Sequence, residues 1–124
     1  MKSLIIMALA AMFSFAPDDA VKPTPEDFAI VSDTVENGVR SIVATPSPLV
    51  CPKQVTANID AQTGVIKEVL YVGGCNGNLK AVNALLKGLT VDQALERLDG
   101  IQCGKRGTSC TDQLARILKK AYNK

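Results

Sequence analysis

The chain has 124 residues, of which 47% are hydrophobic, 21% are charged and 4% are aromatic. This length suits one small domain with a single hydrophobic core and is too short for an enzyme of two domains. Histidine is absent, which excludes every Ser-His or Cys-His catalytic relay and every histidine-ligated metal site. The formal net charge of +2 is too small to indicate nucleic-acid binding from composition.

The first 16 residues have the features of a signal peptide. Leu4 to Ala16 is an almost unbroken apolar run, long enough for the hydrophobic core of a signal peptide and too short to span a bilayer. Small residues precede Pro17, as signal peptidase requires, although a proline after the cleaved bond is unfavourable. A buried N-terminal helix is the alternative. We therefore expect a periplasmic or secreted protein without a membrane span if the signal is real, and a cytoplasmic protein if it is not.

An acidic, proline-containing linker is expected at 17–37. Three prolines fall within 17–25, and six acidic residues stand against one lysine between 18 and 36. Such a segment has little apolar surface to bury, so the folded domain is expected to comprise residues 38–124. Beyond residue 100 the balance reverses, with six basic residues and one acidic residue. The opposite charges of the two ends indicate either ordinary solvent-exposed surfaces or a charge distribution that guides docking to a partner.

Strands are predicted from short runs that are rich in β-branched residues. The run 39–44 ends before two prolines, and alternating apolar residues at 55–59 are followed by a second run at 65–72. Residues 60–64 have the composition of a turn, so these last two runs are expected to form a hairpin.

Three helices are predicted in the C-terminal half. The first has apolar residues at helical spacing between 79 and 86 and ends at Gly88. The second begins with a capping box at Thr90, and the third follows Thr108 and Ser109. These elements predict an α+β fold, in which a small antiparallel sheet of two to three strands is packed on one side by about three helices.

The four cysteines are the main chemical resource of the chain. Cys51 precedes a predicted strand, Cys75 lies in a glycine-rich turn at a helix start, Cys103 lies in a loop and Cys110 opens the last helix. Turns that flank separate elements allow these side chains to converge, although the chain lacks the CxxC pair of a zinc ribbon. A position near a helix N-terminus also stabilises a thiolate.

Two kinds of site follow from this arrangement. In a reducing compartment we expect the cysteines to bind zinc or an iron–sulfur cluster, with Gly73, Gly74 and Gly77 bringing backbone amides toward the sulfurs. In an oxidising compartment we expect two disulfides and no cofactor, as in an exported binding domain without catalysis. Four unconnected thiols are the third alternative.

A basic pair, Lys105 and Arg106, lies between two glycines before the last helix. It could bind a phosphate against the amides of that helix, and an exposed basic loop without a ligand is the alternative. No residue pattern indicates a catalytic group.

Two segments carry a specific motif: GGCNGNLKAV, from Gly73, and GLTVDQALERLDGIQCGKRGTSCTDQLARIL, from Gly88. These segments closely resemble the TSCPD-domain family, and the resemblance extends over residues 51–124 and includes all four cysteines. One departure is Thr111, which stands where the family has proline. Thr108, Ser109 and Asp112 keep their places, and the resemblance implies that they shape the site.

The resemblance implies an accessory role. The same domain is found at the C-terminus of adenosylcobalamin-dependent ribonucleoside-diphosphate reductases, which implies a link to DNA synthesis, a nucleotide or a reductase subunit as partner, and no direct DNA binding. A reductase barrel does not fit in so short a chain, so we do not expect an enzyme by itself. A weaker similarity to the U-type iron–sulfur scaffold proteins, through Cys51, Cys75 and Cys110, implies a similar fold.

Overall fold

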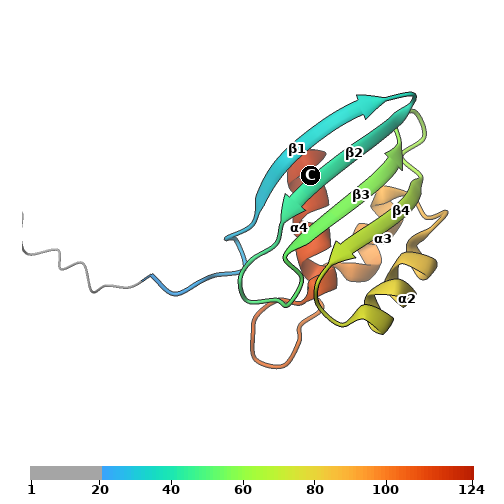
Figure 1. The fold of residues 1–124 in the computed structure, drawn as a ribbon. Coiled ribbons are helices and arrows are strands. Elements are labelled where there is room, and N and C mark those ends of the chain that lie inside the picture. The colour runs from blue at the N-terminus through green and yellow to red at the C-terminus, as the bar shows by residue number, and fades with distance from the viewer. Residues whose placement is uncertain (1–20) are drawn as a thin grey trace, which may run out of the picture.

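The structure is a computed structural model that describes residues 21–124. The expected signal peptide lies outside the described residues. One antiparallel sheet and three helices form two layers, and the helices lie on a single face of the sheet (Figure 1). Among residues 21–124, no helix is both long enough and apolar enough to cross a bilayer.

Each strand of the sheet pairs antiparallel with the next strand along the chain. The strands are β1 (Ala29–Glu36), β2 (Val39–Thr45), β3 (Gln54–Asp60) and β4 (Ile66–Val72). β2 corresponds to the strand predicted at 39–44, and β3 with β4 forms the predicted hairpin. The expectation of two to three strands is wrong, because β1 adds a fourth.

β1 lies within 17–37, the segment for which the sequence predicts a linker. Almost the whole strand is exposed, and Val31 and Val35 keep 65% and 63% of their surface. Hydrogen bonds to β2 hold it in place, and an ion pair of 2.7 Å between Arg40 Nη2 and Asp33 Oδ2 spans the two strands. A strand that buries so little apolar surface lacks the alternating pattern from which strands are predicted.

The outer edge of β4 is partly covered. The side-chain oxygen of Asn83, from the helix that follows β4, accepts a hydrogen bond from the Val69 amide at 2.7 Å. The Ile66 amide donates to the Leu89 carbonyl at 2.8 Å. These contacts occupy edge amides that would otherwise be free to pair with another strand.

Three helices follow the sheet, as the sequence predicts. They are α2 (Asn76–Leu86), α3 (Val91–Leu98) and α4 (Cys110–Ala121). The expected capping box opens α3: Thr90 Oγ1 accepts from the Gln93 amide at 3.2 Å, and Gln93 Oε1 accepts from the Thr90 amide at 2.9 Å. Ser109 caps α4 by accepting from the Asp112 amide at 3.0 Å.

The core lies between the helices and the inner face of the sheet. Alternation along β3 turns Val55, Ala57 and Ile59 inward, and each is 2% exposed or less. Leu114 and Leu118 of α4 are fully buried opposite them. Because truncating such a leucine to alanine costs about 2–5 kcal/mol, the packing fixes α4 firmly on the sheet.

The loops that matter for the site gather at one end of the sheet. β2 and β4 end there, β3 and α2 begin there, and the connection between α3 and α4 passes over the same end (Figure 1).

Candidate functional site

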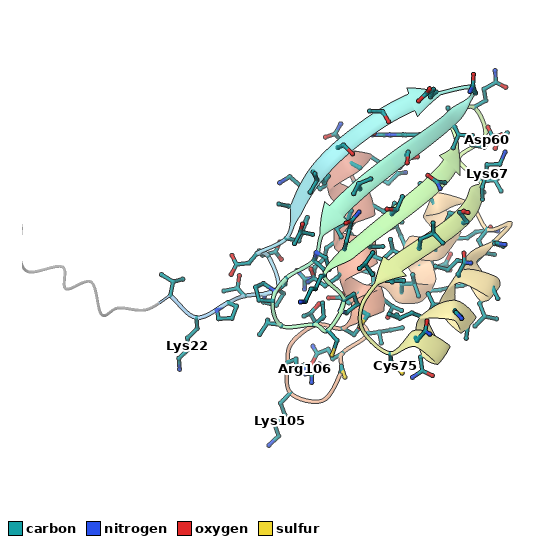
Figure 2. All side chains as sticks on the ribbon, in the orientation of Figure 1. Lys22, Asp60, Lys67, Cys75, Lys105 and Arg106 are labelled. Carbon is teal, nitrogen blue, oxygen red and sulfur yellow. The ribbon has the colours of Figure 1, made fainter. Side chains whose placement is uncertain are left out.

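The four cysteines lie in these gathered loops. Cys51 follows β2, Cys75 is the residue before α2, Cys103 lies between α3 and α4, and Cys110 is the first residue of α4. Cys110 is half-buried and the other three are exposed. Figure 2 shows Cys75 at this end of the molecule. We name the region the cysteine end and define it as residues 46–53, 73–76 and 100–110.

The loop after β2 packs against the turn after β4. The Lys53 amide donates a hydrogen bond to the Val72 carbonyl at 2.7 Å. Gly74 has a φ of +83°, and a Cβ at this position would lie 3.0 Å from Cγ of Pro52. Only glycine combines a positive φ with so close an approach. The backbone therefore holds these two cysteine-bearing turns side by side.

The Cys110 thiol lies between the loops of two other cysteines. Burial raises the pKa of this thiol. A hydrogen bond from the backbone N–H of Cys51 lowers the pKa, whereas negative charge on the Cys51 and Cys103 thiols raises it. The Tyr71 hydroxyl donates to the Cys110 carbonyl at 3.4 Å, and burial raises the pKa of that phenol. Cys51, Cys103 and Cys110 therefore lie within electrostatic reach of one another.

The loop between α3 and α4 folds back on itself. The Cys103 amide donates to the Thr108 carbonyl at 3.0 Å, and the Arg106 amide donates to the Cys103 carbonyl at 3.3 Å. These bonds place Cys103 at the base of the loop, beside the start of α4, with Lys105 and Arg106 at the tip.

A buried carboxylate fixes the base of this loop to α4. Asp112 is 1% exposed, and its Oδ1 accepts from the Gly100 amide at 2.8 Å. Its Oδ2 accepts from the Thr108 hydroxyl at 2.6 Å and from Arg116 Nε at 2.8 Å. Burial raises the pKa of this carboxyl, but the hydrogen bonds from Arg116, Thr108 and Gly100 outweigh burial and hold the pKa below its ordinary value. The charged carboxylate thus joins both ends of the loop.

Two further side chains extend this buried polar network. The Ser109 hydroxyl donates to the Ile101 carbonyl at 2.7 Å. The Gln113 side chain accepts from the Ser47 amide at 2.9 Å and donates to the Pro25 carbonyl at 2.8 Å. Sequence reasoning missed these Gln113 contacts, because they join residues 66 and 88 positions apart. The one available signal is the place of Gln113 in the segment from Gly88 that resembles the TSCPD family, shortly after Cys110.

The other predicted site residues have different surroundings. Gly73 and Gly74 both have positive φ and face the loop after β2. Gly77 lies in the first turn of α2, and a Cβ there would have nothing within 4 Å. Lys105 and Arg106 are exposed, and neither forms an ion pair within residues 21–124.

The cysteine side chains do not close around a centre. Among residues 21–124, no group of three or more Cys, Asp or Glu side chains is arranged to hold a metal ion. All four cysteines are free thiols, so nothing in the structure supports the expected pair of disulfides. The donor chemistry suits a soft metal, because thiolates are preferred ligands of zinc and of iron–sulfur clusters. A metal would therefore need the cysteine side chains to move closer together.

A family profile for the TSCPD domain matches residues 31–122. The chain belongs to the TSCPD family. The match begins within β1, before residue 38, where the sequence predicts that the domain starts. The four cysteines and the Asp112 network of this TSCPD protein all lie within the matched residues. Comparison with curated proteins and with solved structures gives no match.

Proposed function

We propose that this TSCPD protein is an accessory domain that binds a zinc ion at its cysteine end and acts beside a partner related to ribonucleoside-diphosphate reductases. The observation that carries the metal proposal is the gathering of four thiols from separate segments at one end of the sheet, Cys51, Cys75, Cys103 and Cys110. Four cysteine thiolates are a common ligand set of a structural zinc ion. An iron–sulfur cluster held by the same thiols is the alternative cofactor.

Hydrogen bonds and close packing hold the loops that carry these thiols. When bound, zinc would supply a cross-link between loops, and its binding free energy would add to the free energy of folding. Asp112 fixes the start of α4 and the base of the Cys103 loop, while Gly74 allows the Cys75 turn to pack on Pro52. The Cys103 loop is exposed and is held at its base by the hydrogen bond from the Cys103 amide to the Thr108 carbonyl.

Family membership supports the accessory part of the proposal. The same domain occurs at the C-terminus of adenosylcobalamin-dependent ribonucleoside-diphosphate reductases, where a separate barrel carries the catalysis. The described residues form one small core of a four-stranded sheet and three helices, and they contain no such barrel. We therefore infer that the domain acts on or beside a separate protein.

Titration of the reduced, metal-free protein with zinc tests the metal proposal. We expect one zinc per chain and a higher Tm, because a ligand that binds only the folded state at 100 times its Kd adds about 2.7 kcal/mol to stability. Cobalt serves as a spectroscopic probe, and we expect the charge-transfer absorption of thiolate ligands.

Serine variants identify the ligands. We expect each of Cys51→Ser, Cys75→Ser, Cys103→Ser and Cys110→Ser to weaken zinc binding and to abolish the zinc-dependent rise in Tm. Leu85→Ser is a matched control, because Leu85 lies toward the far end of α2 and is 76% exposed. Zinc binding that survives all four cysteine substitutions, or a Tm that does not respond to zinc, would contradict the proposal.

A further inference from the structure

A cleft lies between the outer edge of β4 and the helix α2, which runs beside that strand (Figure 1). Its volume is about 260 Å³. Residues of both elements line it, and they include Val69, Leu70 and Tyr71 of β4 and Leu79, Lys80 and Asn83 of α2. The cleft therefore combines the backbone edge of a strand with the side chains of a helix.

The backbone of β4 directs hydrogen-bonding groups into this cleft. The Val69 amide faces the outer edge, because it donates to Asn83 Oδ1 at 2.7 Å. The Val72 carbonyl faces β3, because it accepts from the Lys53 amide at 2.7 Å. Successive residues of an antiparallel strand turn their N–H and C=O to opposite edges, so both groups of Tyr71 face the same edge as Val69. Within residues 21–124, no loop or helix supplies a hydrogen bond to either group.

An extended peptide fits these open groups better than a simple anion does. A peptide group supplies an acceptor for the Tyr71 N–H and a donor for its C=O, as a neighbouring strand would. Sulfate can accept from the N–H but has nothing to donate to the C=O. The backbone edge of the cleft therefore favours a peptide added as a short strand.

Such a strand has to end inside the cleft. Beyond Tyr71, the side-chain amide of Asn83 already occupies the Val69 amide, and further along the Ile66 amide donates to the Leu89 carbonyl. A peptide that pairs with Tyr71 cannot continue along the edge without displacing these contacts. The occupant is therefore the end of a chain rather than its middle.

The charge of the cleft distinguishes between the two ends of a chain. Among the residues that line it, Lys80 carries the one formal charge, and no carboxylate lies there. An ammonium repels the positive amino terminus of a peptide and attracts the single negative charge of its carboxyl terminus. Leu70 and Leu79 add apolar surface for the last side chains.

We propose that the cleft between β4 and α2 binds the carboxyl-terminal residues of a partner protein in an extended conformation. A peptide group of the partner pairs with the backbone of Tyr71, and its terminal carboxylate lies near Lys80. Main-chain hydrogen bonds and capture of the terminal carboxylate are both established modes of peptide recognition. This inference rests on the accessory role proposed above and names the chemistry of the partner, and it does not depend on bound metal.

Titration of the isotope-labelled full-length chain with the peptide Gly-Ser-Gly-Ala-Val-Leu, followed by NMR, tests the inference. We expect the amide resonance of Tyr71 to shift and its hydrogen exchange to slow, because this N–H gains an acceptor. The same peptide with an amidated C-terminus should bind about two- to fivefold more weakly, as expected for the loss of an exposed ion pair.

A substitution at Lys80 tests the contact with the carboxylate. We expect Lys80→Ala to weaken binding of the free-acid peptide by the same factor and to leave binding of the amidated peptide unchanged, because the two charges act as one pair. Lys87→Ala is the matched control. Lys87 is an exposed lysine at the C-terminal end of α2 that does not line the cleft, so this variant should bind both peptides like the wild type.

Three results would overturn the inference. The first is a Tyr71 amide that does not respond to the free-acid peptide. The second is equal affinity of the wild type for the two peptides, since that would remove the role of the carboxylate. The third is an equal loss of affinity in Lys80→Ala and Lys87→Ala, since that would be an effect of net charge alone.

Measurements with and without zinc separate this inference from the metal proposal. A Tyr71 amide that responds to the peptide in a protein that takes up no zinc would reject the metal proposal and support the cleft. Zinc binding by a protein whose Tyr71 amide ignores the peptide would do the reverse.

Discussion

Asp112 is buried and charged, because Arg116, Thr108 and Gly100 all donate hydrogen bonds to its carboxylate. An asparagine at this position keeps the shape but lacks the charge and one of the two acceptor oxygens. We expect Asp112→Asn to lower the free energy of unfolding by about 2–4 kcal/mol, since it leaves buried donors without partners. Urea unfolding at pH 7 measures the loss.

The effect of this substitution should depend on pH. The folded-state pKa of Asp112 lies below the ordinary value of 3.8, so the carboxylate contributes stability above that pH and loses it as the pH falls through the folded-state pKa. The difference between wild type and variant should therefore shrink in acid. Asp92→Asn is the control, because the Asp92 side chain is 72% exposed in its ion pair, and should cost less than about 1 kcal/mol. A difference that stays constant down to pH 2 would refute this account.

Gly74 offers a test of the packing between the two cysteine-bearing turns. A Cβ there would lie 2.9 Å from Leu79 Cδ1 and 3.0 Å from Pro52 Cγ, on a backbone with a φ of +83°. We expect Gly74→Ala to lower the free energy of unfolding by about 1–3 kcal/mol and to weaken zinc binding. Gly77→Ala should instead stabilise the protein by up to about 1 kcal/mol, because Gly77 lies in α2 with open space around it. Loss of stability in both variants would argue against the packing explanation.

At the scale of the element, β1 depends on the turn that joins it to β2. Asn37 and Gly38 have φ of +53° and +77°, as in the two-residue turns that match the twist of a hairpin. Gly38→Ala should cost about 1–2 kcal/mol in this left-handed conformation. Since β1 buries little, we expect hydrogen exchange of its amides to accelerate while β3 stays protected. Acceleration in both strands alike would contradict a separate role for the turn.

Some helices and strands are supported by several signals in the sequence, and others by very few. α3 and α4 combine an apolar stripe with a capping residue, and β3 with β4 combines strong strand-formers with a turn, so several signals agree. β1 offers no buried face, and the acids around it suggest a linker. Its one local signal is Asn37-Gly38, a pair typical of tight hairpins.

At the scale of the whole molecule, topology determines what could be predicted of the site. The sequence predicts each cysteine in a turn or loop, just before a strand or at a helix start, and an antiparallel sheet brings alternate turns to one end. The contacts of Gln113 with Ser47 and Pro25 have no local cause. They arise only when the segment before β1, the loop after β2 and α4 meet in the finished fold.

The partly covered edge of β4 has a consequence for self-association. A sheet can extend only through a strand with free amides and carbonyls, and within the described chain β1 is the strand that offers the more open edge. Two copies that join through β1 would form one continuous sheet with a partly covered β4 at each end. Because the Ile66 and Val69 amides already have partners, β4 is a poorer site for strand addition than β1, and pairing through β1 favours a dimer over a growing fibril.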